Sequence, residues 1–186
     1  MNRNEQNPDR PLNRLPLDAA AAIERAPIYG LLDNVRSVWN VGSMFRTADA
    51  ACLGGLFLCG LTATPPRPDM EKTALGATET VPWDYWPDTP AAVRGLQERG
   101  ITVIALEQTD DARPFYEFEC PFPACFVVGH EVHGVSSEVL ELADMKVEIP
   151  MGGAKQSLNV AVSFGVMAYK LLGLWRAAGQ RPEVRS

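Results

Sequence analysis

Apolar runs of strand type alternate along this chain with segments of helical spacing, and this alternation restricts the fold more than any other feature. Strands separated by helices are typical of an α/β fold, because each helix returns the chain so that the next strand pairs in parallel. The pattern predicts strands at 28–35, 56–61, 101–107, 124–129 and 146–150. It predicts helices at 43–51, 89–100, 136–143 and 157–175. We therefore expect a mostly parallel sheet flanked by helices, with ligands bound outside the carboxyl ends of its strands.

Residues that start and stop helices mark two of these segments. Thr89 is the expected N-cap of the second predicted helix, with Pro90 at its first position and Gly100 at its end. The pair Gly54-Gly55 is expected to end the first predicted helix. The proline-rich segment 64–69 is expected to form a loop.

The length of 186 residues suits one domain with a full hydrophobic core. Hydrophobic residues make up 46 % and charged residues 22 %, which is ordinary for a globular protein, and no apolar run reaches the roughly 18 residues of a membrane span. The first residues also lack the apolar segment of a secretory signal. We expect a polar N-terminal arm at 1–27 with a short helix at 19–25, a globular domain at 28–175 and a basic tail at 176–186.

The cysteines and the net charge bear on the cellular compartment and on the partner. Cys52, Cys59, Cys120 and Cys125 form no C-x-x-C pair, so we expect reduced, mostly buried thiols in a cytoplasmic protein and no zinc site. The net charge of −6 argues mildly against a nucleic-acid binder, since phosphate contacts need Lys and Arg. The basic residues of the arm and tail leave two readings open, a local basic face or two solvated tails.

The stretch F-V-V-G-H-E-V-H-G-V-S sets two kinds of enzyme against each other. A zinc protease carries H-E-x-x-H on a helix, with its two histidines four positions apart on one face. Here His130 and His133 are only three positions apart, and the chain has no other histidine. They follow a predicted strand, and Gly129 and Gly134 bracket them. A metal hydrolase built on the two histidines and Glu131 is therefore the weaker reading.

The stronger reading is a glycine-flanked loop at the carboxyl end of a strand. Gly129 allows the backbone to approach a ligand closely, and Glu131 then projects into a site. Taken alone, the pattern G-x-E-x-x-G also fits an ordinary polar turn, so the choice between the two depends on other stretches of the chain.

Two other stretches combine polar side chains with the start of a helix. Residues 32–50 carry Asn34, Asn40, Gly42, Arg46 and Thr47. An arginine in the second turn of a helix that begins near Asn40 can meet an anionic substrate, although a surface arginine and a capping asparagine fit the same letters. Residues 149–162 run from a strand through a glycine-rich turn into a buried helix, which Ser157 or Asn159 could simply cap.

Together the three stretches resemble the SpoU, or TrmH-like, branch of the SPOUT superfamily of RNA methyltransferases. The motif N-x-x-x-x-x-N-x-G-x-x-x-R-T of that branch is matched from Asn34 to Thr47, and its motif G-x-E-x-x-G is matched from Gly129 to Gly134. The letters I-P-M follow at 149–151, S-L-N-V-A-V at 157–162, and K-T-A-L-G-A-T-E-T-V-P-W at 72–83 is also similar. The resemblance spans roughly residues 28–175, and its specificity comes from the order of the motifs.

The resemblance implies a fold, a reaction and a set of site residues. The C-terminal part is expected to form a deep trefoil knot whose loops bind S-adenosylmethionine, and two subunits are expected to pair as a homodimer that completes the site. The expected reaction methylates a ribose 2′-hydroxyl of tRNA or rRNA and needs neither a metal nor a membrane. The expected catalytic residues are Asn40, Arg46, Glu131, Ser157 and Asn159. The expected cofactor contacts, largely through backbone groups, are Leu106, Val128, Gly129, Ile149, Met151 and Leu158.

Arg46 has two possible roles in such a reaction. The resemblance implies a base, whereas arginine stays protonated in proteins. We therefore favour Arg46 as a group that grips a substrate phosphate and stabilises developing negative charge. The alternative to an enzyme is a non-catalytic RNA- or cofactor-binding module of the same fold, which has no evident need of all five catalytic candidates. His130 stands where many relatives have a small polar residue, and we expect it to shape only the rim of the pocket.

Overall fold

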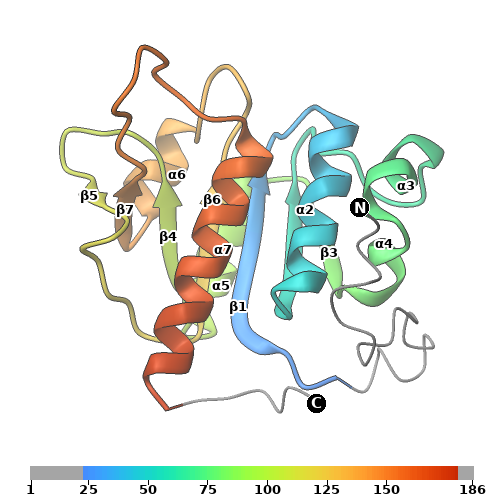
Figure 1. Cartoon of the computed structure of the whole chain (residues 1–186), viewed down its shortest axis with the longest axis horizontal. Coiled ribbons are helices and arrows are strands. Elements are labelled where there is room, and N and C mark those ends of the chain that lie inside the picture. The colour runs from blue at the N-terminus through green and yellow to red at the C-terminus, as the bar shows by residue number, and fades with distance from the viewer. Residues whose placement is uncertain (1–22, 180–186) are drawn as a thin grey trace, which may run out of the picture.

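A seven-stranded sheet forms the centre of the computed structural model, which describes residues 23–179 (Figure 1). The strand order is β3-β2-β1-β6-β4-β7-β5, and every neighbouring pair is parallel, which confirms the expected α/β architecture. The strands are β1 (Ala26–Asp33), β2 (Leu53–Cys59), β3 (Trp83–Trp86), β4 (Thr102–Leu106), β5 (Arg113–Pro114), β6 (Ala124–Val128) and β7 (Met145–Glu148).

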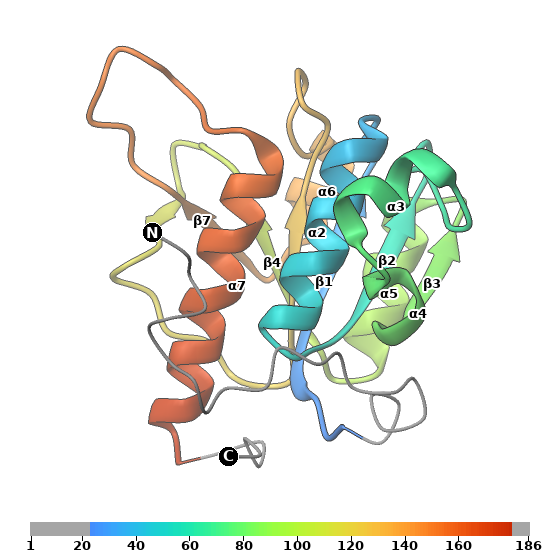
Figure 2. The same ribbon diagram turned by 45° about the vertical axis from the view of Figure 1, so that its right-hand side comes forward.

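Helices cover both faces of this sheet and divide the core into two layers. One face carries α2 (Val38–Ala50), α3 (Pro68–Ala74), α4 (Ala77–Thr80) and α7 (Val160–Ala177). The other carries α5 (Thr89–Glu98) and α6 (Ser137–Leu142) (Figures 1 and 2). Strand β6 is buried along its whole length, because Phe126 packs on Phe164 of α7 while Cys125 and Val127 face the second layer. A strand buried on both faces has the continuous apolar sequence that predicted it.

The first predicted helix and the strand after it begin earlier than the sequence pattern indicated. Helix α2 starts at Val38, since the Ser37 hydroxyl caps it by accepting a hydrogen bond from the Asn40 amide. Strand β2 starts at Leu53, so Gly54 and Gly55 lie within the strand and do not end the helix. A Cβ at Gly55 would stand 2.8 Å from the Pro82 carbonyl oxygen, so these glycines serve close backbone packing.

Two helix starts are also corrected by the structure. Asp88, and not Thr89, is the N-cap of α5, with its carboxylate accepting from the Ala91 amide at 2.7 Å. The Thr89 hydroxyl instead donates to the buried Asp33 carboxylate. Helix α7 starts at Val160 and ends at Ala177, so residues 157–159 precede it and the predicted domain limit at 175 falls inside it. The elements α3, α4, β3 and β5 were not predicted, and α3 begins inside the segment expected to be a loop.

The four cysteines have the reduced state that the sequence predicted. Cys59 and Cys125 are buried and Cys52 and Cys120 are half-buried, all four with free thiols. Burial raises the pKa of the Cys59 thiol to about 12, so this side chain is an apolar core residue.

By length and composition α7 passes a test for a membrane span, as core helices of globular proteins also do. Residues 1–22 of the expected arm and 180–186 of the tail lie outside the described residues; residues 23–25 of the expected short helix are not helical, and β1 already begins at Ala26 within the expected arm.

Glycine at position 42 sets the distance between α2 and α3. A Cβ at Gly42 would overlap the Thr73 hydroxyl and the Met70 carbonyl oxygen of α3. Gly173 of α7 is a matched control, because nothing lies within 4 Å of a Cβ built there. We expect Gly42→Ala to lower the free energy of unfolding by about 1–3 kcal/mol through overpacking, measured by urea unfolding at one protein concentration. Gly173→Ala should leave it unchanged or raise it by up to about 1 kcal/mol; equal values for the two variants would contradict this account.

Candidate functional site

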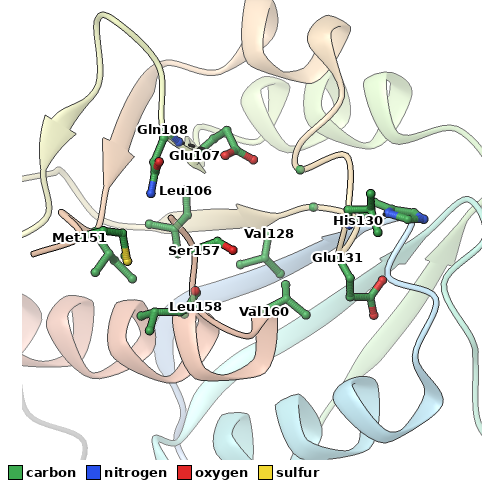
Figure 3. A pocket seen from close by; sticks show the side chains of 15 residues that line it. Leu106, Glu107, Gln108, Val128, His130, Glu131, Met151, Ser157, Leu158 and Val160 are labelled. Atoms are coloured by element: carbon green, nitrogen blue, oxygen red, sulfur yellow. Dashed lines mark hydrogen bonds between the residues drawn. The ribbon is translucent and has the colours of Figure 1, made fainter. Parts of the chain in front are cut away.

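A cavity of about 190 Å³ opens where β4, β6 and β7 end and α7 begins (Figure 3). This is the edge of a parallel sheet where ligands bind, because connections leave the carboxyl ends of the strands there. Of the expected catalytic residues, Glu131 and Ser157 line it. All six residues expected to contact a cofactor line it as well, namely Leu106, Val128, Gly129, Ile149, Met151 and Leu158.

The loop after β6 folds back on itself beside this cavity. The backbones of His130 and Gly134 exchange two hydrogen bonds, of 2.9 and 2.8 Å. A Cβ at Gly129 would overlap the backbone of Gly134 and Val135, so only glycine allows this crossing. The His130 ring closes the turn, since its Nδ1 accepts from the Val132 amide at 3.0 Å. That bond occupies the lone pair which a metal would need on this nitrogen. Within residues 23–179 no three His, Cys, Asp or Glu side chains group as metal ligands.

Glu131 ties this loop to the segment that enters α2. Its Oε2 accepts from the Arg36 amide at 3.1 Å, and its Oε1 accepts from the Ser37 amide at 2.9 Å and from Asn40 Nδ2 at 3.1 Å. Burial raises the pKa of the Glu131 carboxyl, but the hydrogen bonds from the Ser37 and Arg36 backbone and from Asn40 outweigh it, and the net pKa is lowered. The group is therefore an ionised carboxylate at neutral pH.

Asn159 extends the same network to the last helix. Its Nδ2 donates to Asn40 Oδ1 at 3.2 Å, while its Oδ1 caps α7 by accepting from the Ala161 amide at 2.9 Å. The capping role that the sequence left open for Asn159 and the contact with Asn40 are thus both present. Glu131, Asn40 and Asn159, one from each predicted motif, form one chain of hydrogen bonds.

Two acidic residues that the sequence analysis did not single out hold the loops beside the site through hydrogen bonds. Glu107, directly after β4, accepts from the Val135 amide at 2.9 Å and from the Gln108 amide at 3.0 Å. Asp33, at the end of β1, is 1 % exposed and accepts from the Thr89 hydroxyl and the Ser136 amide. Both stand at the carboxyl ends of strands, and that position is the signal by which the sequence could have revealed them.

Arg46 lies apart from the other expected site residues in this chain. It is an exposed residue of α2, six positions after Asn40, which is about 9 Å along the helix axis and on another side of the helix. It does not line the cavity, and within residues 23–179 its side chain makes no hydrogen bond or ion pair. Ser157 lines the cavity with an exposed side chain that likewise makes no hydrogen bond among the described residues.

Known proteins share both the sequence and the fold of this chain. The model of the SpoU rRNA Methylase family matches residues 27–169. A tRNA (guanosine(18)-2'-O)-methyltransferase of Thermus thermophilus is 39 % identical over 140 residues, covering 75 % of this chain and 71 % of that protein. The 23S rRNA (guanosine-2'-O-)-methyltransferase RlmB of Vibrio vulnificus is 33 % identical over 165 residues, covering 88 % of this chain and 66 % of its own length.

Solved structures agree with these matches. The A. aeolicus TrmH/SpoU tRNA modifying enzyme superposes with a TM-score of 0.79 at 28 % identity, covering 91 % of this chain and 88 % of that one. An AdoMet-bound rRNA methyltransferase from Sinorhizobium meliloti superposes with a TM-score of 0.74 at 26 % identity, covering 89 % of this chain and 61 % of that one.

The lowered pKa of Glu131 makes its contribution to stability depend on pH. A carboxyl whose pKa is lower in the folded state stabilises the fold fully above its unfolded-state value of about 4.3, and the contribution is lost as pH falls through the lowered pKa. Glu131→Gln removes the titrating charge. We expect the stability difference between the native protein and Glu131→Gln, measured by urea unfolding from pH 7 to 3, to shrink at the acidic end. A constant difference would show that the charge of Glu131 does not stabilise the loop.

Proposed function

Because this chain belongs to the SpoU rRNA Methylase family, we propose that it transfers a methyl group from S-adenosylmethionine to a ribose 2′-hydroxyl of tRNA or rRNA. The observation that carries the proposal is the hydrogen-bonded chain of Glu131, Asn40 and Asn159 beside a cavity lined by all the expected cofactor residues. An ordinary polar turn has no need of such a chain across three distant motifs.

The cavity suits S-adenosylmethionine in the chemistry of its walls. Leu106, Ile149, Met151 and Leu158 supply apolar surface, and the glycine at 129 leaves the backbone open to a ligand. Gln108 Nε2 donates to the Gln156 carbonyl oxygen at 2.9 Å, which links the two loops on one side of the cavity. When bound, S-adenosylmethionine supplies an electrophilic methyl group on a positively charged sulfur.

The residues of the chain then have to hold the ribose and manage charge. Glu131 acts as a positioning residue, since its carboxylate is already occupied by three donors. The free hydroxyl of Ser157 is available to orient the 2′-hydroxyl within the cavity. Arg46 remains protonated, grips the substrate phosphate and stabilises the negative charge that develops on the ribose oxygen.

A homodimer would bring Arg46 to a cavity. Helices α2 and α7 lie next to each other on one face of the sheet (Figure 2), and they expose Trp39, Val162 and Tyr169 by 50 %, 52 % and 54 %. Exposed apolar side chains on adjacent helices are typical of a surface that pairs with another subunit. In this proposal, two copies pair along α2 and α7, and each supplies Arg46 to the cavity of the other. The working form is a cytoplasmic homodimer that binds neither a membrane nor a metal.

The path of the chain around β7 supports the expected trefoil knot. Leu106 of β4 and Arg113 of β5 both pair with Val147 of β7, so the connection between them passes the carboxyl end of β7. We propose that the chain leaving β7 at Ile149 threads through this connection before it reaches α7. When the two termini are pulled apart, the end-to-end length of the extended chain would then be measurably shorter than that of an unknotted chain of 186 residues.

A transfer assay tests the reaction. The purified protein, labelled S-adenosylmethionine and separate pools of unmodified tRNA and rRNA should give a 2′-O-methylnucleoside from one pool, identified by mass spectrometry of the digested RNA. S-adenosylmethionine binding without transfer to either pool would favour the non-catalytic binding module instead.

Loss of the Arg46 side chain should affect transfer much more than binding of S-adenosylmethionine. We expect Arg46→Ala to lower kcat/KM by at least about a hundredfold, which is the effect of removing one preorganised donor that stabilises developing charge. Arg94→Ala on the exposed side of α5, on the other face of the sheet, is the control and should keep the native rate. A near-native rate for Arg46→Ala would remove Arg46 from both of the roles considered for it.

Metal removal should leave the reaction unchanged. Methyl transfer from a sulfonium needs alignment and proton management but no Lewis acid. We expect the same transfer rate before and after dialysis of the protein against a chelator. The RNA stock contains the same concentration of magnesium in both assays. A chelator-sensitive rate that zinc restores would revive the metal site at His130 and His133.

A further inference from the structure

A second hollow, of about 610 Å³, lies beside the carboxyl end of β2 and along β3. It is lined by residues 60–64, Arg67, Trp83 and Tyr85, and we refer to these residues as the aromatic hollow. Leu61, Trp83 and Tyr85 are 74 %, 38 % and 44 % exposed, so apolar and aromatic surface faces solvent here. The comparisons and the cavity described above assign no role to this part of the molecule.

The two aromatic rings of the hollow are not part of the core. Trp83 and Tyr85 are two positions apart on the edge strand β3, so they point to the same side of the sheet. Trp86 points to the other side and packs in the layer under α5. The Tyr85 hydroxyl donates to the Gly60 carbonyl oxygen at 3.0 Å, which holds the ring in place. An ordered aromatic ring offers stacking area at little cost in conformational entropy.

Hydrogen bonds fix the hollow to the segment that Glu131 holds. Asn34 Oδ1 accepts from the Leu61 amide at 2.9 Å. The Thr62 hydroxyl accepts from the Val35 amide at 3.0 Å and donates to the Leu32 carbonyl oxygen at 2.9 Å. The next two residues along the chain, Arg36 and Ser37, donate to Glu131. These bonds place the hollow beside the residues that bind Glu131, which itself lines the cavity.

Arg67 is the one charged residue among those that line the hollow, and this favours an anionic ligand. Among residues 23–179 the guanidinium groups of Arg36 and Arg67 make no ion pair or hydrogen bond. Two acidic side chains of the adjacent α3 are already engaged. Asp69 pairs with Lys72 at 3.3 Å, and Glu71 accepts from the Gly76 amide and the Thr78 hydroxyl. Aromatic rings next to unpaired arginines are the pattern that binds single-stranded nucleic acid, because bases stack on the rings and phosphates meet the cations.

We propose that the aromatic hollow binds an unpaired nucleobase of the substrate RNA, close to the nucleotide whose ribose enters the cavity. The base stacks on Trp83 or Tyr85, and Arg67 contacts the adjoining phosphate. This inference rests on the proposed function insofar as the ligand is the RNA substrate, and it assigns to the hollow the selection of substrates that present a flipped-out or single-stranded base there.

Ring-removing variants test the hollow. Labelled pools of unmodified tRNA transcripts and of rRNA fragments are titrated with the native protein, Trp83→Ala and Tyr85→Ala, and binding is followed by fluorescence anisotropy. We expect the Kd for RNA to rise about five- to a hundredfold in each variant, with S-adenosylmethionine affinity unchanged by calorimetry. Tyr85→Phe keeps the ring and should bind RNA as the native protein does. Tyr116→Ala, which removes a 57 % exposed ring beyond β5 at the opposite edge of the sheet, is the matched control.

The outcomes separate this inference from the proposed function. RNA affinities of both ring variants within twofold of the native value would overturn the nucleobase site, even with methyl transfer intact. A native protein that binds RNA through the hollow but transfers no methyl group would keep the site and overturn the reaction. A native protein that binds neither pool would overturn both. If the alanine variants fail to fold, Trp83→Leu and Tyr85→Leu keep apolar bulk without an aromatic face and should show the same loss.

Discussion

The carboxylate of Glu131 is the contact on which the rest of the site depends. It lies on the loop after β6, yet it satisfies the first backbone amides of the α2 entry and the side chain of Asn40, which are 91 to 95 positions away in the chain. Helix N-termini leave their amides without partners, and the Glu131 carboxylate accepts the amide of the N-cap Ser37 with one oxygen and that of Arg36 with the other. Because Asn40 in turn accepts from Asn159, one charge aligns the ends of β1 and β6 and the start of α7.

The cavity and the aromatic hollow follow from a single feature of the sheet. All seven strands run in parallel, so the carboxyl ends of all of them, and the connections that leave there, lie at the same edge. The acids Asp33 and Glu107 bind neighbouring connections to one another, and Glu107 also lines the cavity. These bonds link the loops at this edge across several neighbouring strands.

The sequence predicted four strands with mostly buried apolar runs as well as β7, which has one buried residue of four, and it missed β3 and β5. Strand β3 is exposed at three of its four positions and β5 has only two residues, so neither carries a hydrophobic pattern. The six residues expected to contact a cofactor lie at one cavity because the motifs that contain them determine the local backbone conformation. For Asp33 the sequence offers only its position near the end of a strand, since its partners Thr89 and Ser136 are 56 and 103 positions away. The same limit applies to Arg46, which does not line the cavity of this chain and lies on another side of α2 from Asn40.

The link between Asn40 and Asn159 also has a consequence for biosynthesis. The two residues are separated by 119 positions, and Asn159 is at the same time the residue from which α7 starts. A ribosome that adds about 5–20 residues each second releases β1, α2 and most of the sheet seconds before Asn159 emerges. During that interval the nascent chain lacks the contact between Asn40 and Asn159 and the residues of α7 that line the cavity. The residues that complete the cavity are therefore among the last of the described residues to be synthesised, so the cavity cannot close before the strands of the sheet have been made.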